Sequence, residues 1–263
     1  MGWRAGLASA VLALALSWAG SAFAATPAPE PSPFDDWAAL VVAGDFHGAG
    51  GGPTEAFDNA RRDVSKELQR IGFSAHNMRQ FSVRPERYKD GPLKSDPRAI
   101  YETLSDLSGK AKSGCLLYVT SHGAPEGVLI DDKILSPAIL NRILGATCGA
   151  RPTVVIMSAC FSGVFVRPLA QPNRMILTAA RRDRTSFGCG EDSVYPFFDD
   201  CVLKSSPTAH DFIALASAVK SCVARREVAE GAKPPSEPQI WIGGDLRPVL
   251  PLHPFPTGPP KGD

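Results

Sequence analysis

Two stretches of sequence decide the fold: GCLLYVTSHG at residues 114–123 and TVVIMSACFSG at residues 153–163. Each begins as a continuous apolar run and ends in small or polar residues followed by glycine. Such runs are typical of strands that are buried on both faces of a parallel sheet. The 38 residues from His122 to Cys160 (160 − 122) are about what a strand–helix–strand crossover with a small hairpin insertion needs. The two runs, Gly114–Thr120 and Thr153–Ser158, are therefore predicted to be neighbouring parallel strands.

Similar runs and helical patterns flank this pair on both sides. Further strands are predicted at Trp37–Gly44, Phe73–Phe81, Met175–Ala180 and Gln239–Gly243. Helices are predicted at Glu55–Ile71, from Asp96-Pro97 to Lys110, from Ser136-Pro137 to about Gly145, and over Thr208–Glu230. Pro85–Pro97 is predicted to be a loop and Gly127–Leu135 a short hairpin. Strands alternating with helices predict an α/β fold: a three-layer α/β/α sandwich with an about six-stranded, mostly parallel sheet and helices on both faces.

The two ends of the chain differ in composition from the middle. Residues 1–24 contain a basic residue, Arg4, an apolar core and a small-x-small ending, which is the pattern of a secretory signal peptide. An uncleaved N-terminal anchor is the alternative, but the apolar core is short for a membrane span, so no stable membrane anchor is predicted. Residues 25–35 are predicted to be a linker, residues 36–246 one domain, and residues 247–263 a loose Pro-rich tail. The protein is therefore expected to be secreted or periplasmic.

The composition excludes several classes of partner and cofactor. With 28 basic and 27 acidic residues the formal net charge is +1, so neither nucleic acid nor an anionic membrane is expected as a partner. No CxxC pair or Cys/His cluster has zinc-like spacing, so no metal and no cofactor is predicted. Six cysteines in an exported chain permit disulfides, and Cys189 with Cys201 is one candidate pair among several connectivities. Nothing in the sequence predicts an oligomeric state.

The candidate catalytic residues follow the ends of the two central strands. Ligands of such sheets bind at the carboxyl ends of the strands, where His122 and Cys160 are expected to flank one substrate bond. A thiolate is a strong nucleophile, and a nearby imidazole can protonate the leaving amine. The backbone N–H groups of Gly123 and Cys160 could donate hydrogen bonds to a developing oxyanion. The GK[ST] motif of phosphate-binding loops and the GxSxG motif of serine hydrolases do not occur in the sequence.

The same residues carry a resemblance to a known family. His122-Gly123 and Ala159-Cys160-Phe161-Ser162-Gly163, each after an apolar strand, resemble the His-Gly and Ala-Cys-x-Ser-Gly motifs of the legumain-type cysteine peptidases. The stretch from Leu177 to Cys189 is similar to the Thr-Ala-Ala … Ser-Ser-Tyr-Ala-Cys stretch of legumains, and the whole resemblance runs from about Trp37 to Leu203. It implies a caspase-like fold and a catalytic dyad of Cys160 and His122, with Gly123 in the oxyanion hole.

The resemblance also implies a substrate-binding pocket, in which this chain departs from the family. Ser158, Ser186 and, less directly, Asp199 or Asp200 match the positions that line the pocket, but Ser158 stands where legumains carry Glu. Asp45 is the candidate substitute for an Asn that helps to orient the catalytic His in legumains. These departures mean that the Asn specificity of legumains does not carry over.

Two kinds of pocket therefore stay open as alternatives. The Arg-His pair of the legumain pocket has no clean counterpart near Phe57-Asp58. An Asp-lined pocket would accept a basic or amide side chain, whereas a pocket lined by Arg181, Arg182 or Arg184 would accept an acidic one.

The predicted function is a cysteine endopeptidase that hydrolyses a protein or peptide substrate through the Cys-His dyad and a thioester intermediate. A transpeptidase would use the same dyad, and a non-catalytic binding or scaffold protein could use the same fold, so both are alternatives.

Overall fold

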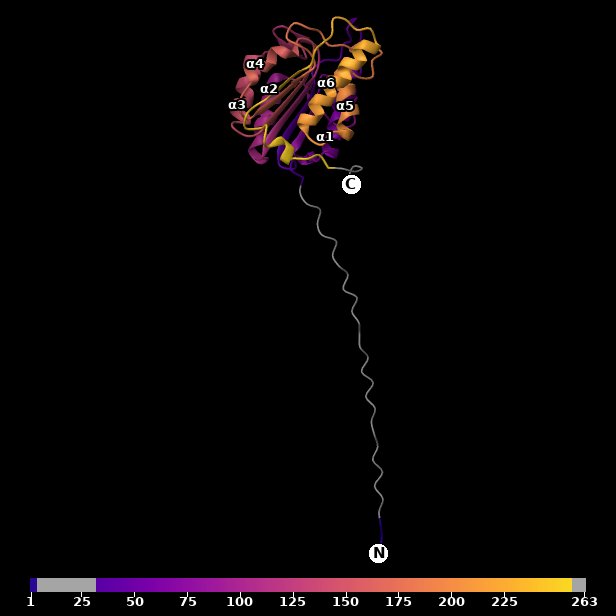
Figure 1. Ribbon diagram of the computed structural model, residues 1–263, viewed down its shortest axis with the longest axis vertical. Coiled ribbons are helices and arrows are strands. Elements are labelled where there is room, and N and C mark those ends of the chain that lie inside the picture. The colour runs from indigo at the N-terminus through magenta and orange to yellow at the C-terminus, as the bar shows by residue number, and fades with distance from the viewer. Residues whose placement is uncertain (4–31, 257–263) are drawn as a thin grey trace. The chain divides into compact units, whose positions relative to one another are not determined.

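The computed structural model describes residues 1–3 and 32–256. Figure 1 shows a sheet covered by helices, and the helices and strands of the described part of the chain lie within residues 32–256. The predicted signal peptide at residues 1–24, most of the predicted linker and residues 257–263 of the predicted tail lie outside the described residues. Among the described residues, no helix is both long enough and apolar enough to cross a membrane.

The centre of the fold is a seven-stranded sheet in the order β10-β9-β8-β4-β1-β2-β3. Its strands are β1 (Trp37–Ala43), β2 (Met78–Ser82), β3 (Leu93–Lys94), β4 (Gly114–Thr120), β8 (Thr153–Ser158), β9 (Arg174–Thr178) and β10 (Gln239–Ile242). All neighbours pair in parallel except β10, which is antiparallel to β9. The prediction of a mostly parallel sheet is confirmed, and β4 and β8 are neighbours as expected.

The seventh strand, β3, lies in a segment that the sequence predicts to be a loop. Leu93 and Lys94 pair with Phe81 and Ser82 at the edge of the sheet. Two residues are too few to leave an alternating or apolar pattern, so their pairing is not visible in the sequence. The predicted strand at Phe73–Phe81 is likewise shorter, because a 3₁₀ turn (η1, Ala75–Asn77) precedes β2.

Helices cover both faces of the sheet, as the sequence predicts. Figure 1 shows α1 (Ala56–Arg70), α5 (Phe197–Ser205) and α6 (Phe212–Ala229) on one face, and α2 (Pro97–Lys110), α3 (Pro137–Thr147) and α4 (Val166–Leu169) on the other. Short 3₁₀ turns are η2 (Pro85–Arg87), η3 (Ser162–Phe165), η4 (Ser206–Thr208) and η5 (Leu250–Leu252). A small antiparallel sheet of β5 (Gly123–Ala124), β6 (Gly127–Ile130) and β7 (Lys133–Leu135) forms the predicted hairpin region.

Side-chain caps explain where three of these helices begin. Asp96, Ser136 and Asp211 each accept backbone N–H groups in the first turn of α2, α3 and α6, respectively. A cap of this kind satisfies a donor that has no partner within the helix. Because Asp211 is the cap, α6 begins at Phe212 rather than at the predicted Thr208, which lies in η4.

Alternation along the central strands divides the interior into two apolar cores. In β1, Ala39 and Val41 pack against α1, α5 and α6, whereas Leu40 and Val42 pack against α2 and α3. Successive side chains of a strand point to opposite faces, so a fully apolar strand supplies both cores at once. All seven residues of β1 and of β4 are buried. The sheet is therefore a rigid platform whose strand ends hold the loops above it.

An aromatic cluster joins the first and last described segments to the domain. Phe34 stacks on Phe73 with ring centroids 4.9 Å apart, and Phe255 meets Phe212 edge-on at 5.0 Å. Phe34 and Phe255 lie just outside the range 36–246, and both are buried. The chain after Arg247 is therefore packed against the domain as far as Phe255 rather than loose, because the side chains of Leu250 and Phe255 are buried in the same core as α6.

Two disulfides are present, and neither is the candidate pair considered from the sequence. Cys115 of β4 is bonded to Cys148 at the end of α3, and Cys201 of α5 to Cys222 of α6. The candidate pair Cys189–Cys201 is not formed, because Cys201 is buried between α5 and α6 and bonded to Cys222, while Cys189 lies in the loop before α5. Cys160 and Cys189 are the free cysteines among the described residues.

Candidate active site

His122 and Cys160 follow neighbouring strands at the same height. Thr120 of β4 is paired with Ser158 of β8, and each candidate catalytic residue comes two residues after its paired strand end. The two chains stay in contact beyond the strands, since Ser121 N–H donates to the Ser158 carbonyl at 3.0 Å. The register of the sheet therefore places the histidine and the cysteine at the same level on neighbouring strands.

Gly123 lies directly against the backbone of Cys160. A Cβ atom at position 123 would be 2.1 Å from the Cys160 carbonyl oxygen, a distance that no side chain tolerates. The Cys160 N–H has no hydrogen-bond acceptor among the described residues. The N–H groups of Gly123 and Cys160, the two candidate oxyanion-hole donors, therefore belong to backbone segments in direct contact.

The His122 ring is held by a main-chain carbonyl. Its Nε2 atom lies 2.9 Å from the His47 carbonyl oxygen, and Phe57 packs edge-on at a centroid distance of 5.2 Å. A carbonyl oxygen can only accept a hydrogen bond, so Nε2 carries a proton and is the donor of this hydrogen bond. In the neutral ring Nδ1 is then the basic atom, and in the protonated ring it is the second donor. This tautomer suits a residue that first accepts and then delivers a proton.

The Cys160 thiol sits on a sharp turn after β8. Phe161 has a positive φ of 55°, which is unfavourable for a non-glycine residue and is held by its N–H donating to the Arg184 carbonyl at 2.8 Å. The Ser186 N–H donates to the Cys160 sulfur at 3.3 Å, and the Ser186 carbonyl and hydroxyl oxygens lie 3.6 Å from it. An N–H group aimed at the sulfur stabilises a negative charge there. Ser186 is thus placed beside the thiol.

Asp45 contacts His47, not His122. Its carboxylate accepts a hydrogen bond from the ring Nδ1 of His47 at 2.8 Å. It also accepts hydrogen bonds from the backbone N–H groups of Phe46 at 2.6 Å and His47 at 3.1 Å. Asp45 therefore orients His122 only indirectly, by fixing the loop whose carbonyl holds the ring. The role of His47 was missed because it acts through its backbone, which leaves no side-chain signal in the sequence.

Ser158 and Asp199 face each other beneath the site. The Asp199 carboxylate accepts the Ser158 hydroxyl at 2.7 Å, the Thr120 hydroxyl at 2.9 Å and the Tyr118 hydroxyl. Asp199 is fully buried, and this burial raises the pKa of its carboxyl to about 6, although the hydroxyl groups oppose the rise. Both side chains are buried and are hydrogen-bonded to each other. Asp200, the other candidate, forms ion pairs with Lys204 and Arg226 instead.

A crossing loop (residues 180–191) runs over the strand ends from β9 to the Gly-rich loop (residues 48–53). Beyond Ser186, the Cys189 carbonyl accepts Ala49 N–H at 2.8 Å, and the Glu191 carboxylate accepts Gly52 N–H at 3.1 Å. Burial, and secondly the nearby Cys160, raises the pKa of the Cys189 thiol to about 11. Cys189 therefore remains a protonated, weakly nucleophilic thiol at neutral pH.

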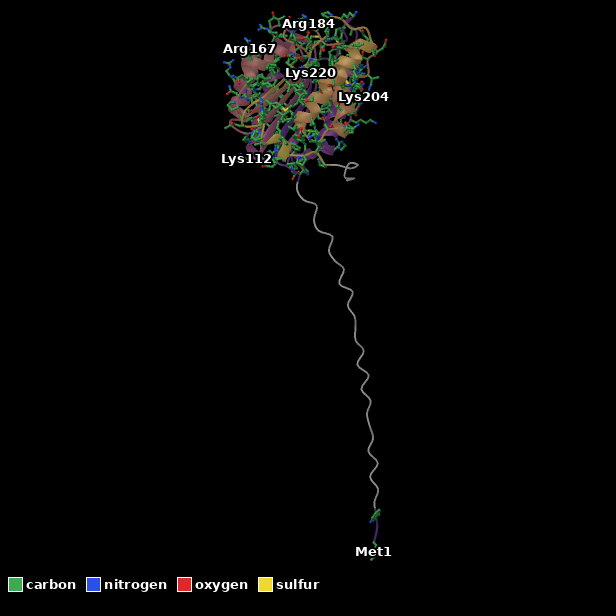
Figure 2. The ribbon with its side chains drawn as sticks, in the orientation of Figure 1. Met1, Lys112, Arg167, Arg184, Lys204 and Lys220 are labelled. Atoms are coloured by element: carbon green, nitrogen blue, oxygen red, sulfur yellow. A yellow bond between two sulfur atoms is a disulfide. The ribbon has the colours of Figure 1, made fainter. Side chains whose placement is uncertain are left out.

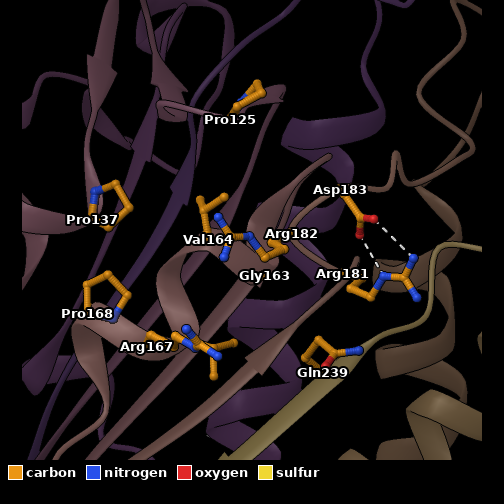
Figure 3. Close-up of a pocket in the computed structure, with 11 residues that line it drawn as sticks. Pro125, Pro137, Gly163, Val164, Arg167, Pro168, Arg181, Arg182, Asp183 and Gln239 are labelled. Carbon is orange, nitrogen blue, oxygen red and sulfur yellow. Dashed lines mark hydrogen bonds and ion pairs between the residues drawn. The ribbon is translucent and has the colours of Figure 1, made fainter.

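A cavity of about 670 Å³ opens at the other end of the crossing loop. It is lined by Pro125, Gly163, Val164, Arg167, Arg181 and Arg182, among others (Figure 3). Arg184, the third arginine considered from the sequence, is not in its lining. Figure 2 shows Arg167 and Arg184 at one end of the domain and Lys112, which precedes β4, at the opposite end. The cavity is thus at the carboxyl ends of the strands.

No group of three or more His, Cys, Asp and Glu side chains that could hold a metal ion occurs in the described part of the chain. The chemistry available at the site is that of a thiol, an imidazole and backbone N–H donors. These groups can perform nucleophilic acyl transfer with general acid and base assistance.

Comparisons with known proteins agree with this arrangement. Residues 93–242, more than half of the 263-residue chain, match the peptidase C13 family. Among solved structures, caspase-1 from Spodoptera frugiperda is similar with a TM-score of 0.58 at 15% identity, covering 82% of this chain and 91% of the caspase. No curated protein sequence shows significant similarity. The caspase likeness confirms the predicted caspase-like α/β fold.

The family match includes β4, β8 and β9, and with them the loops that hold His122, Cys160 and Ser186. It confirms the resemblance seen in the His-Gly and Ala-Cys-x-Ser-Gly motifs. The chain therefore belongs to the peptidase C13 family, the legumain-type cysteine peptidases with a caspase-like fold.

Proposed function

We propose that the protein is an endopeptidase that hydrolyses peptide bonds through a thioester on Cys160, with His122 as acid and base. The observation that carries this proposal is the shared register of the dyad. Both residues stand two positions beyond the paired strand ends Thr120 and Ser158, and Gly123 touches the Cys160 backbone. The proposed substrate is a protein or peptide.

In the acylation step, His122 Nδ1 accepts the proton of the Cys160 thiol, the resulting thiolate attacks the carbonyl carbon of the scissile bond, and the C=O electron pair moves onto the oxygen. The Gly123 and Cys160 N–H groups donate to that oxyanion. When the tetrahedral intermediate collapses, the C–N bond breaks and the protonated His122 ring delivers its Nδ1 proton to the leaving amine. A thioester and the new amino terminus result.

In the deacylation step, neutral His122 accepts a proton from water at Nδ1 while the water oxygen attacks the thioester carbonyl. The C–S bond then breaks, the carboxylic acid leaves, and the thiol is regenerated. Throughout the cycle the His47 carbonyl keeps the Nε2 proton in place, so only Nδ1 exchanges protons. Ser186, whose N–H reaches the sulfur, supports its negative charge.

Cleavage of a peptide library with mass-spectrometric detection tests the proposal. Cys160→Ala should abolish cleavage, and His122→Ala should lower kcat/KM by roughly 10²-fold, the usual contribution of a general acid–base group. The matched control is Cys189→Ser, which removes the other free thiol and should retain cleavage. The same measurement detects peptide-transfer products, which would indicate the transpeptidase alternative.

A thiol-reactive peptide probe gives a second readout at pH 7. It should label Cys160 and not Cys189, because burial keeps the Cys189 thiol protonated. Labelling that persists in Cys160→Ala, or that disappears in Cys189→Ser, would contradict the assignment of Cys160 as nucleophile.

We also propose that the protein acts outside the cytoplasm, either secreted or in a periplasm. Its amino-terminal sequence supports export, and disulfides such as Cys115–Cys148 and Cys201–Cys222 form in oxidising compartments. Amino-terminal sequencing of the exported protein should give a start near Ala25, and an intact Met1 in the mature protein would oppose this.

A further inference from the structure

The cavity at the start of the crossing loop and the Gly-rich loop lie on opposite sides of Cys160. Following the crossing loop, residues Arg181 and Arg182 line the cavity, Arg184 holds Phe161, and Ser186 touches the Cys160 sulfur. The loop then reaches Ala49 through the Cys189 carbonyl. A peptide whose scissile bond lies at Cys160 would thus have the cavity on one side and the Gly-rich loop on the other.

The cavity is within reach of residues close to the scissile bond. Gly163 lines it and comes three residues after Cys160, and Pro125 lines it two residues after Gly123. Three residues span at most about 11 Å even when fully extended, and less in the 3₁₀ turn that contains Gly163. A side chain within about three residues of the scissile bond can therefore enter it.

Two guanidinium groups in the cavity form no ion pair or hydrogen bond with the described residues. Arg167 and Arg182 are exposed, and neither side chain has an ion-pair or hydrogen-bond partner within the described part of the chain. Arg181, in contrast, is bound to Asp183 at 2.6 Å and to Glu237 at 2.7 Å. Figure 3 shows Arg167 and Arg182 between the prolines of one wall and the Arg181–Asp183 pair. The charge in the cavity that is not balanced by an ion pair is therefore positive.

The backbone that carries these arginines is fixed. A Cβ atom at Gly163 would be 2.4 Å from the Arg182 nitrogen, so η3 packs tightly against this part of the crossing loop. Arg181 N–H donates to the Ser236 carbonyl at 2.8 Å, and Arg184 N–H to the Arg181 carbonyl at 3.1 Å. Apolar side chains such as Val164 and Pro168 complete the walls. Binding therefore requires little reordering of the backbone, which favours affinity.

From these observations we propose that the cavity, the arginine pocket, is a subsite that binds an acidic side chain of the substrate near the scissile bond. Guanidinium groups bind carboxylates in a paired geometry that ammonium groups cannot match. The apolar walls accept the methylene groups of Glu or the neighbouring peptide. The inference rests on the proposed peptidase function, and it names the class of substrate: peptides with Asp or Glu within about three residues of the cleaved bond.

Position-by-position substrate scanning tests the arginine pocket. Peptides that carry Glu, Gln or Lys at each position flanking the cleaved bond are compared by kcat/KM. We expect Glu to exceed Gln at one position by about fivefold, as for two solvent-exposed ion pairs. Raising the salt concentration should reduce this preference.

Charge reversal in the pocket should reverse the preference. In the double variant Arg167→Glu/Arg182→Glu, Lys should be preferred to Glu at the same position. The control is Arg225→Glu, the same kind of charge reversal at one exposed position of α6, which should keep the preference for Glu. The inference is overturned if no position prefers Glu, or if the double variant keeps the same preference as Arg225→Glu.

A binding measurement separates failure of the pocket from failure of the proposed function. Fluorescence anisotropy of a Glu-containing peptide is measured with Cys160→Ala, alone and combined with the two charge reversals. Binding that is lost on charge reversal supports the pocket even if the unaltered protein neither cleaves peptides nor labels at Cys160. If the protein cleaves peptides without any preference for Glu, and peptide binding is unchanged by the charge reversals, the peptidase proposal is supported and the arginine pocket is contradicted.

Discussion

The environment of Asp199 shows how a single buried residue supports the site. Its carboxylate accepts the hydroxyl groups of Tyr118, Thr120 and Ser158, so it links β4, β8 and α5 directly under the loops of the dyad. Buried polar groups are tolerated where they are bonded in this way. Ser158 stands where legumains carry Glu, and the structure shows its hydroxyl turned inward to Asp199. The acidic group of this region is thus supplied from α5 rather than from the strand before Cys160.

Asp199 also predicts how stability depends on pH. Burial raises the pKa of its carboxyl to about 6, whereas an unfolded Asp titrates near ~4. Between these values the folded state holds a proton that the unfolded state releases, so the free energy of unfolding falls as the pH rises. Asp199→Asn removes this titration and should flatten the profile between about pH 4 and pH 7, by on the order of 2 kcal/mol.

Urea unfolding of both proteins at a series of pH values measures this effect. Burial also raises the pKa of Asp58, and because Asp58 is present in both proteins, its titration contributes equally to both profiles. Equal slopes in the two profiles would show that Asp199 is not the group responsible.

At the residue scale, the positions of side chains after strands could be predicted from the sequence, whereas backbone contacts could not. His122 and Cys160 follow neighbouring strands, as predicted from the two apolar runs that precede them. The partner of His122 is the carbonyl of His47, and every residue has a carbonyl, so no pattern indicates it. Asp45 was expected to orient His122 itself, yet it holds the loop that does so.

At the scale of elements, the contact between β5 and the turn after β8 decides the geometry of the site. Gly123 begins β5 and lies against the Cys160 carbonyl. Gly123→Ala would place a methyl group 2.1 Å from that oxygen, so one backbone must move. We expect kcat/KM to fall by roughly 10²-fold, the scale of losing an oxyanion-hole donor.

The matched control for this substitution is Gly145→Ala within α3, where a Cβ atom meets nothing within 4 Å. It should leave kcat/KM intact and raise the free energy of unfolding by about 0.5–1 kcal/mol, because alanine favours a helix. Chemical denaturation and peptide cleavage measure both variants. A Gly123→Ala enzyme that cleaves as well as Gly145→Ala would show that the contact is not essential.

Strong elements were predictable from the sequence, and weak or capped ones were not. The strands β4 and β8 have their predicted bounds, because their apolar runs end at glycine, proline or polar residues. The two-residue β3 leaves no pattern, and the start of α6 depends on which of several polar residues becomes the cap. Capping is decided by local geometry, which residue type alone does not specify.

At the scale of the whole domain, the two apolar cores lie on opposite faces of one sheet, and this arrangement determines the fold. Every central strand is apolar on both faces, so helices must cover both, and the three-layer architecture results. The fold class was therefore predictable from a few buried runs. The disulfide pairs were not, because pairing depends on which strands and helices meet in space.

The aromatic cluster predicts that the last described segment contributes to the stability of the domain. Phe255 is buried against Phe212, whereas Leu252, three residues earlier, is exposed. Phe255→Ala should lower the free energy of unfolding by about 3 kcal/mol, and Leu252→Ala by less than about 0.5 kcal/mol. Thermal or urea unfolding distinguishes them. Similar losses in both variants would mean that this segment detaches before the domain unfolds.

The placement of the disulfides has a consequence for a chain that has been cut. One bridge lies at residues 115–148 and the other at residues 201–222, so no bridge spans the segment between 148 and 201. A single break in the crossing loop would leave two fragments with no covalent link, held together by noncovalent contacts such as the pairing of β9 with β10 and the packing of α5 and α6 on the sheet. Such a nicked molecule would migrate as one species in a native gel and as two bands in a denaturing gel without reductant.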